Sequence, residues 1–276
     1  MIEIVEPGFF TTVQDWGRHQ YACYGVPPSG PMDRTAFSHA QQLVGNFRNE
    51  AILECTLKGP TLRFESEAVV AVCGAPVTVH QNQEEATMDI AFKCFPGDLL
   101  KLGTVQEGMR TYLAFGGGLK IPKVLGSRSF FYPLTASRLK KGDQIETGTT
   151  SEWNILGNTS PLQAYFKTSI LKATKGPEWN VLSNHEQKML SKTPFEIGSN
   201  SRMGYRLNGI MESNSYNLPS SSIVPGVVQL TPNGQLVALM ADAQVTGGYP
   251  RVLILTDEAM AILAQKRTGQ QISFEI

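Results

Sequence analysis

The segment ILECTLKGPTLRFESEAVVAVC, residues 52–73, alternates short runs rich in β-branched and aromatic residues with turn-forming residues. Runs of this length, bounded by glycine, proline or asparagine, are typical of β-strands. The runs in this segment are Ile52–Leu57, Thr61–Glu65 and Ala68–Cys73, and further ones are Thr111–Phe115 and Val227–Leu230. The chain's 26 glycines and 16 prolines punctuate such runs at close intervals, as in barrels and sandwiches. The sequence therefore predicts a mainly β fold.

A few short helices interrupt the β pattern. Their predicted spans are about residues 36–44, 184–191 and 258–266. Pro31 suits the first turn of the first helix. Ser183 and Glu186 fit a capping box ahead of the second, in which each side chain bonds an N–H group of the other residue. Asp257 is the expected cap of the third helix, and Gly269 is its expected end.

Composition limits the classes of function. The 276 residues are 41% hydrophobic and only 17% charged, and 24 basic residues balance 24 acidic ones. This balance removes the usual electrostatic case for nucleic acid or an anionic membrane as partner. The first residues lack the basic and apolar regions of a signal peptide, and no run approaches the roughly 18 apolar residues of a membrane helix. We therefore expect a cytoplasmic protein.

Cysteine and histidine spacing indicates neither a metal site nor a disulfide framework. The cysteines are Cys23, Cys55, Cys73 and Cys94, and the histidines are His19, His39, His80 and His185. They form no C-x-x-C or H-E-x-x-H motif, so we expect buried, reduced thiols and no bound metal.

Two similar segments suggest two β-rich halves. Residues 139–145 resemble residues 266–272, and both look like a basic turn that leads into a closing strand. We expect the halves to divide near residue 150, in the Ser/Thr-rich stretch Thr147–Ser151, which gives domains 1–150 and 151–276 with a possible exchange of strands.

Several cofactor and catalytic motifs are missing from the sequence. It contains no G-x-x-x-x-G-K-[ST] phosphate loop, no dinucleotide fingerprint and no G-x-S-x-G elbow. It also has no Met-Lys-Met biotinyl site, so biotin is not carried by this chain. Any nucleotide or biotin chemistry must come mostly from other chains.

Two segments near the start of the chain are candidate binding elements. Gln14, Asp15 and Arg18 surround a glycine and could present an amide, a carboxylate and a guanidinium to one small polar ligand. The alternative is a turn stabilised by an internal Asp–Arg pair. Ser29 lies in a stiff Gly/Pro loop before the first helix, where it could help to bind a carboxylate or phosphate. Helix capping alone is the alternative for that loop.

The second half contains two more candidates. Arg202 and Arg206 would share one face of a strand, which suits an anionic ligand, a solvated edge or a contact with another protein chain. From Leu236 onward, alternate residues form one strand face that changes from apolar to polar at Asp242, Gln244 and Thr246. This change occurs beside a Gly-Gly turn and predicts a pocket, with a polar barrel rim as the alternative.

Taken together, these segments resemble a known family. The chain is similar to the biotin-dependent carboxyltransferase, or allophanate hydrolase subunit 2, family, which includes the C subunit of 5-oxoprolinase and an antagonist of a sensor-kinase inhibitor. Matching residues, in order, are Thr12–Asp15, Gly17-Arg18, Gly25–Pro27, Ser29-Gly30, Met32-Asp33, Leu43–Asn46, Leu53-Glu54, Gly74-Ala75, Tyr112–Ala114, Gly116-Gly117, Val124–Ser129, Arg202–Leu207, Val224–Gly226, Gln229, Ala241–Gln244 and Thr246–Pro250. Each motif is modest, but the ordered set is specific.

The resemblance implies two tandem cyclophilin-like β-barrel domains and a role in a complex. For a 5-oxoprolinase, the expected partners are a second cyclophilin-like protein, similar to the B subunit of that enzyme or to allophanate hydrolase subunit 1, and a lactam hydrolase of the LamB/YcsF type. The complex would use ATP to open 5-oxoproline to L-glutamate, and this chain alone would be inactive.

The resemblance also implies a site. Its expected catalytic residues are Asp15, Arg18, Asp242 and Gln244, and its expected substrate-binding residues are Gln14, Ser29, Asp33, Arg202, Arg206, Gln229, Thr246 and Tyr249. An arginine would hold the substrate carboxylate, and an aspartate or glutamine would fix the lactam amide. We expect both ends of the chain to contribute to one cleft. The alternatives are an acceptor-binding carboxyltransferase part of a urea or allophanate system, and a non-catalytic regulator of the partner subunit.

Overall fold

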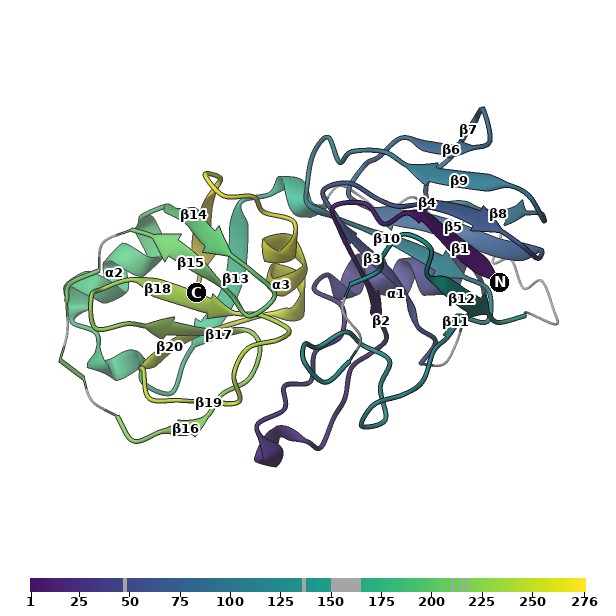
Figure 1. The fold of residues 1–276 in the computed structure, drawn as a ribbon. Helices are drawn as coiled ribbons and strands as arrows, with labels where there is room; N and C mark the ends of the chain where they lie inside the picture. Colours follow the sequence, from purple (N-terminus) through teal and green to yellow (C-terminus); the bar gives the residue numbers. More distant parts are fainter. Residues whose placement is uncertain (47–48, 136–137, 150–164, 210, 214, 217) are drawn as a thin grey trace. The chain divides into compact units, whose positions relative to one another are not determined.

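The chain forms two compact units in a computed structural model that describes residues 1–46, 49–135, 138–149, 165–209, 211–213, 215–216 and 218–276 (Figure 1). The N-terminal unit comprises Met1–Arg18 and Asp33–Ala164, and the C-terminal unit comprises His19–Met32 and Tyr165–Ile276. Residues 19–32 therefore leave the first half of the sequence and join the second unit. The boundary expected at residues 150–151 lies outside the described residues.

The N-terminal unit is built from two sheets and one helix. Its strands are β1 Ile2–Glu6, β2 Phe10–Gln14, β3 Ile52–Thr56, β4 Thr61–Phe64, β5 Ala68–Gly74, β6 Val79–Gln81, β7 Glu84–Ala86, β8 Ala91–Cys94, β9 Leu99–Leu102, β10 Arg110–Phe115, β11 Leu119–Lys120 and β12 Gln144–Thr147. The larger sheet has the order β11-β12-β1-β4-β9-β6-β7, and the smaller has the order β2-β3-β10-β5-β8.

The smaller sheet is covered on both faces. Val70 and Val72 of β5 pack into the core shared with β1, β4 and β9, whereas Ala71 and Cys73 pack toward helix α1, Arg34–Leu43. The period of two in a strand explains this division. Because both faces are buried, the strand is an unbroken apolar run rather than an alternating one.

Helix α1 begins at Arg34, two residues before the predicted span, and Asp33 precedes it as its cap. The carboxylate of Asp33 accepts a hydrogen bond from the N–H of Ala36 at 3.1 Å, which makes Asp33 the N-cap. Pro31 precedes this cap and is not in the first turn, so that expectation was wrong. An aspartate cap satisfies a free N–H group and complements the helix dipole.

The C-terminal unit is a closed barrel. Its strands are β13 Ile170–Lys175, β14 Phe195–Asn200, β15 Gly204–Asn208, β17 Val227–Leu230, β18 Leu236–Leu239, β20 Arg251–Leu255 and β21 Gln271–Glu275. They close in the order β13-β20-β17-β18-β15-β14-β21, and β21 returns to β13 as a parallel pair. A separate two-stranded sheet contains β16 Ser221–Ser222 and β19 Thr246–Gly247.

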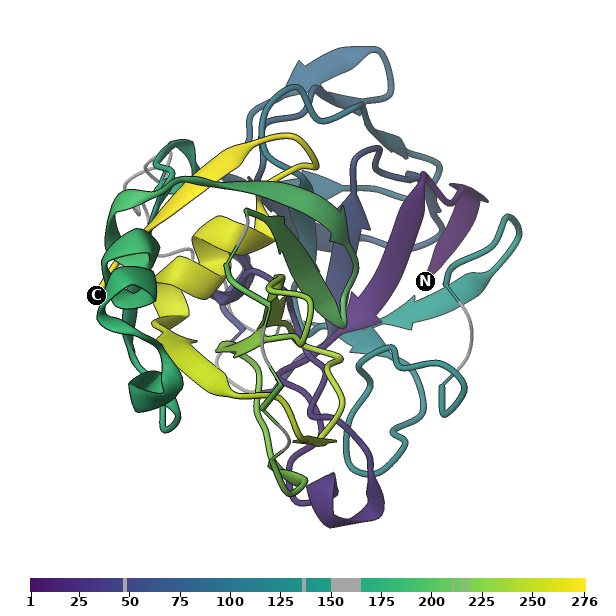
Figure 2. The ribbon, with the colours of Figure 1, turned by 90° about the vertical axis from the view of Figure 1, so that its left-hand side faces the viewer.

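Short helices complete this unit. Figure 2 looks toward the barrel and shows α2, Asn184–Lys192, and α3, Asp257–Ala264, beside its strands. The 3-10 turns are η1 Ala22–Tyr24, η2 Tyr165–Lys167 and η3 Trp179–Val181. The capping box of Ser183 and Glu186 is confirmed. The expected cap of α3 was wrong, because Thr256 accepts the hydrogen bond from Ala259 and Asp257 is the first helical residue.

The predicted class, mainly β with a few short helices, is confirmed. All five predicted strand runs coincide with strands to within a residue or so at each end, as β3, β4, β5, β10 and β17. The two similar segments also behave alike: each turns at a glycine with positive φ, Gly142 or Gly269, and then enters a strand. None of the helices in the described part of the chain combines the length and apolar composition of a membrane span.

Candidate functional site

A groove with several polar side chains lies on the outer face of the C-terminal barrel. Its volume is about 640 Å³, and strands β15, β17 and β18 contribute to its wall together with Gln244 and Tyr249. Gly204, Gln229 and Val237 line it. Their strand neighbours Tyr205 and Val228 belong to the barrel core instead, as the period of two in a strand requires. The groove is therefore built from outward-facing positions of a rigid sheet.

Gln229 is the most deeply buried polar group in the groove. The residue is 2% exposed, and its amide nitrogen Nε2 has no hydrogen-bond partner among the described residues. A Cβ at Gly247 would lie 2.8 Å from that nitrogen, so the lack of a side chain there leaves room for the amide. A buried donor without a partner costs about 1–3 kcal/mol. A ligand carbonyl or carboxylate oxygen would remove that cost.

Three other predicted site residues line the same groove, namely Arg206, Gln244 and Tyr249. Arg206 is exposed, and its Nη1 donates to the amide oxygen of Gln235 at 2.7 Å. That partner is neutral, and no carboxylate in the described part of the chain forms an ion pair with Arg206, so its charge is available for an anion. Two amides, a guanidinium and a phenol therefore line the same groove.

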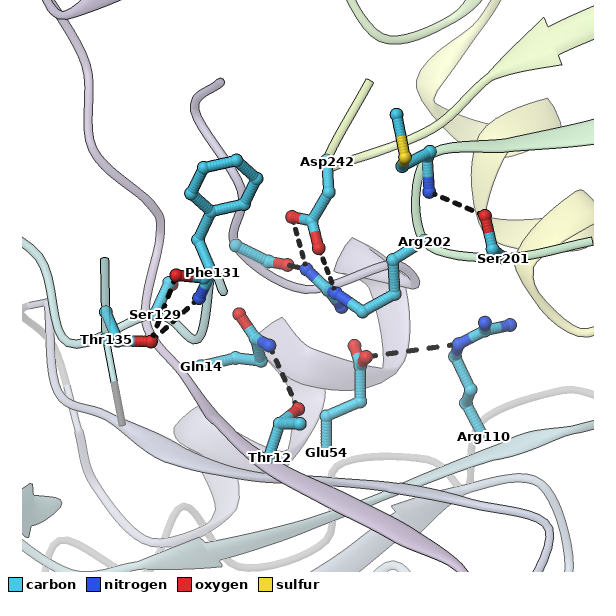
Figure 3. A network of polar contacts seen from close by, with 12 residues as sticks. Thr12, Gln14, Glu54, Arg110, Ser129, Phe131, Thr135, Ser201, Arg202 and Asp242 are labelled. Atoms are coloured by element: carbon cyan, nitrogen blue, oxygen red, sulfur yellow. Dashed lines mark hydrogen bonds and ion pairs between the residues drawn. The ribbon is translucent and has the colours of Figure 1, made fainter. Parts of the chain in front are cut away.

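Arg202 and Asp242 form a buried ion pair outside this groove (Figure 3). Arg202 Nε donates to Oδ2 of Asp242 at 2.7 Å, and Nη2 donates to Oδ1 at 3.0 Å. Nη2 also donates to the carbonyl of Gly30 at 2.7 Å. The pair thus joins residue 30, the turn before β15 and the turn after β18. Bidentate charge-assisted contacts of this kind are strong and directional.

Two expectations about these residues were wrong. Arg202 lies before β15 and is buried, whereas Arg206 on β15 is exposed, so the two do not form one strand face. Strand β18 ends at Leu239, so the alternating face does not continue through Asp242 and Gln244. The chain turns there instead: Asp242 is buried, while Gln244 and Thr246 are exposed.

Ser29 is held against the turn that contains Asp242. Its N–H donates to the carbonyl of Ala241 at 3.1 Å, and its φ of 58° is left-handed. Its hydroxyl is buried and has no hydrogen-bond partner among the described residues. Ser29 is not the helix cap, which is Asp33. Its hydroxyl therefore stays a candidate ligand-binding group.

In the N-terminal unit, Asp15 ties two loops together. Its carboxylate accepts hydrogen bonds from the N–H groups of Gly17 and Arg128, at 2.9 and 2.7 Å, and from the hydroxyls of Ser127 and Ser129. Oδ1 accepts from Gly17, Ser127 and Ser129, and Oδ2 accepts from Arg128, so protein donors engage both carboxylate oxygens. The side chain of Arg18 donates to the carbonyl of Ser129. The geometry favours a structural role for Asp15, as a loop anchor rather than a group that faces substrate.

This unit contains a second buried network, which the sequence motifs did not predict. The hydroxyl of Tyr112 donates to Glu54 at 2.7 Å and accepts from the N–H of Asp33 at 2.8 Å, and Arg110 Nε lies 3.9 Å from Glu54 (Figure 3 shows the Glu54–Arg110 contact). Burial and then the charge of Glu54 raise the pKa of Tyr112 well above its usual range. The available signal was a glutamate inside an apolar strand run, which demands a buried partner.

Gln14 is fully buried at the end of β2. Its Nε2 donates to the hydroxyl of Thr12 at 3.0 Å, and its Oε1 has no partner in the described part of the chain. The predicted residues therefore form a groove set (Arg206, Gln229, Gln244, Tyr249), a set around the buried ion pair (Ser29, Arg202, Asp242) and an N-terminal set (Gln14, Asp15, Arg18, Asp33). Thr246 is exposed on β19 and belongs to none of these sets. That these sets share one cleft stays a prediction.

Comparisons with known proteins identify relatives along the whole chain. A family model described as "Carboxyltransferase domain, subdomain A and B" matches residues 24–276. The chain is 35% identical to the C subunit of 5-oxoprolinase from Escherichia coli, over 99% of this chain and 90% of that protein. It is 30% identical to the C subunit of 5-oxoprolinase from Haemophilus influenzae, over 100% of this chain and 91% of that one.

Solved structures agree with this relationship. TTHA0988 superposes with a TM-score of 0.90 at 28% identity, and K. lactis urea amidolyase with 0.88 at 27%. The match takes in 100% and 99% of this chain, but only 55% of TTHA0988 and 18% of the amidolyase, so the chain spans about half of the first and under a fifth of the second. The ordered motifs, the mainly β architecture and the family match lead to one conclusion: the chain belongs to the carboxyltransferase-domain family of subdomains A and B.

Proposed function

We propose that the chain is one component of an ATP-dependent 5-oxoprolinase, an enzyme complex that opens 5-oxoproline to L-glutamate. The observation that carries this proposal is the 35% identity to the C subunit of the E. coli 5-oxoprolinase, because the alignment covers 99% of this chain and 90% of that relative. A match across nearly both full lengths supports the same role in an assembly more strongly than a shared domain would.

The groove of the C-terminal unit offers the contacts that 5-oxoproline requires. This substrate has one carboxylate, one lactam N–H and one lactam carbonyl. Arg206 supplies a guanidinium for the carboxylate, and the unpartnered Nε2 of Gln229 supplies a donor for the carbonyl. The amide of Gln244 can accept from the lactam N–H. We assign the substrate carboxylate to Arg206 and not to Arg202, because the guanidinium of Arg202 already donates two hydrogen bonds to Asp242.

The groove is larger than this small substrate needs. Its volume of about 640 Å³ lies in the range of sites that hold drug-sized ligands, about 300–1,000 Å³. The remaining space suits groups supplied by another protein of the assembly. A five-membered lactam is a poor acylating agent, so its opening needs activation by ATP. The sequence has no phosphate loop, and we assign nucleotide use to the assembly rather than to particular residues of this chain.

The proposed partners are a second cyclophilin-like protein and a LamB/YcsF-type lactam hydrolase. The test is to reconstitute the three chains and to measure glutamate released from 5-oxoproline with ATP. We expect release to require this chain. Undiminished release when this chain is omitted would contradict the proposal.

Arg206→Ala tests the groove itself. A charge-assisted hydrogen bond is worth about 1.5–3 kcal/mol, so the KM for 5-oxoproline should rise about 10- to 100-fold while the complex still assembles. Arg63→Ala is the matched control, because Arg63 is an exposed arginine of β4 that forms an ion pair with Glu3. An unchanged KM in the Arg206→Ala complex would show that Arg206 does not bind the substrate carboxylate.

A second candidate is the acceptor-binding part of a urea-carboxylating system. It is favoured by the urea amidolyase of Saccharomyces cerevisiae, which is 27% identical over 99% of this chain, although the match covers 16% of that protein. This function needs a biotin carboxylase and a biotinyl carrier, because the chain has no biotinyl site. Carboxyl transfer from the carboxylated carrier to urea would support it. A non-catalytic regulator of the partner protein is the remaining alternative, and turnover that depends on this chain would exclude it.

A further inference from the structure

Three residues with metal-binding side chains meet on the helix-covered side of the smaller sheet in the N-terminal unit. They are His39 of α1, Cys73 of β5 and Asp89 in the turn between β7 and β8. One ligand atom from each, a ring nitrogen, the thiol sulfur and a carboxylate oxygen, all lie within 4.8 Å of one another. No spacing rule finds this set, because the residues are 34 and 16 positions apart and only the fold joins them.

The fold holds each of the three side chains in place. Helix α1 packs on β5 through Ala36 and Ala40, which fixes the helix face that carries His39. Cys73 is fully buried in that packing layer. The turn of Asp89 is joined to β5 by its N–H, which donates to the carbonyl of Val72 at 2.9 Å. The set is therefore preorganised by a helix, a central strand and a turn bound to that strand.

Two of the polar atoms in this set are buried without a hydrogen-bond partner among the described residues. They are Nε2 of His39 and Oδ1 of Asp89, which lie 3.7 Å apart, within ion-pair distance of each other. That separation is too long for a hydrogen bond. It is close to the separation of about 3.4 Å between nitrogen and oxygen ligands on a tetrahedral Zn²⁺ ion, given bond lengths of about 2.0–2.2 Å. The gap has the size of a shared cation.

The three side chains supply ligand types that Zn²⁺ takes in proteins. These are an imidazole nitrogen, a cysteine sulfur and a carboxylate oxygen, contributed here by His39, Cys73 and Asp89.

We propose that His39, Cys73 and Asp89 form a binding site for a divalent transition metal of the Zn²⁺ type. A thiolate and a carboxylate balance the two positive charges, so the occupied site is neutral, as a mostly buried site requires. Binding forms a sulfur–metal bond and releases the thiol proton to solvent. The fourth position is left for water or a ligand, and the side chains of His39 and Asp89, 11% and 18% exposed, provide access.

The site would clamp α1 to β5 and to the turn of Asp89. It is independent of the proposed 5-oxoprolinase role, because it uses none of the groove residues. Its consequence is a metal-dependent increase in the stability of the N-terminal unit, since an ion that binds only the folded state stabilises that state.

The experiment uses the full chain without an affinity tag, in a Cys23→Ser background, because Cys23 is the exposed thiol and could bind metal nonspecifically. The metal-free protein is titrated with Co²⁺, whose thiolate charge-transfer and d–d bands report sulfur ligation and geometry, and the bound ion is then displaced with Zn²⁺. We expect one equivalent to bind, tetrahedral bands, and a rise in melting temperature with Zn²⁺.

Variants separate this site from other thiols. Cys73→Ala should abolish the thiolate band, and His39→Gln and Asp89→Asn should each weaken binding at least tenfold. The matched control is Cys55→Ala, another buried free thiol, which should leave the titration unchanged. His39 and Asp89 are at the edge of the core, so their variants should fold. Metal binding by those variants therefore tests the site even if Cys73→Ala fails to fold. Absence of stoichiometric binding, a thiolate band that persists in the folded Cys73→Ala protein, or unchanged affinity in Asp89→Asn would overturn the proposal.

Discussion

The buried pair of Arg202 and Asp242 should couple three loops of the C-terminal unit. Its two hydrogen bonds, of 2.7 and 3.0 Å, join side chains that are 9% and 7% exposed. Removing one partner of a buried pair costs about 3–5 kcal/mol, because the other charge is left uncompensated. In Asp242→Leu, Arg202 keeps its hydrogen bond to the carbonyl of Gly30. We therefore expect the unfolding free energy to fall by about 3 kcal/mol, the lower end of that range.

The double variant Arg202→Met/Asp242→Leu distinguishes a true pair from two independent contacts. Replacing both charges by apolar residues is often nearly neutral, so the double variant should be more stable than either single variant. The assay is urea unfolding combined with hydrogen exchange of peptides from the C-terminal unit. Arg206→Ala, an exposed neighbour, is the control and should change stability by about 0.5 kcal/mol or less. Additive losses in the double variant would refute the coupling.

The remaining predictions concern stability. Asp15→Ala should lower the unfolding free energy by about 3 kcal/mol and release loop 127–129, seen as faster hydrogen exchange there, because four donors lose their acceptor. Ser183→Ala should cost about 1 kcal/mol in thermal unfolding through the lost capping box. The bidentate contact with Arg251 lowers the pKa of Glu178. The stability that this contact provides is therefore fully present above the ordinary glutamate pKa of about 4.3. It is lost as the pH falls through the lower pKa that Glu178 has in the folded protein. Glu178→Gln should be less stable than wild type at pH 7, by about 1 kcal/mol, and the difference should vanish in acid.

Local signals predicted the elements well. The strand runs were recognisable because β3, β5 and β10 are buried on both faces and read as continuous apolar runs. The capping box of α2 depends only on residues three apart, so it was visible too. For α3, Thr256 and Asp257 are adjacent and both can cap, and only the backbone angles decide between them.

The site was only partly predictable, because its parts depend on tertiary contacts. The alternation from Leu236 is compatible with a long strand and also with a short strand followed by a turn. The structure has the turn, in which the N–H of Asp242 donates to the carbonyl of Arg202. Residues 19–32 join the C-terminal unit through Met32 in its core, which no local pattern indicates. Motif order identified the family and included four residues that line the groove, whose role in binding stays a prediction. The His39, Cys73 and Asp89 cluster has no sequence signature.

If the outer groove of the C-terminal barrel binds the substrate, 5-oxoproline should protect its wall from hydrogen exchange. The most direct measurement is hydrogen exchange of the assembled complex with and without 5-oxoproline. We expect slower exchange in peptides that cover residues 199–206, 227–233 and 244–249, and loss of this effect in Arg206→Ala. Protection confined to other segments, or unchanged exchange in all three at saturating substrate, would contradict binding in this groove.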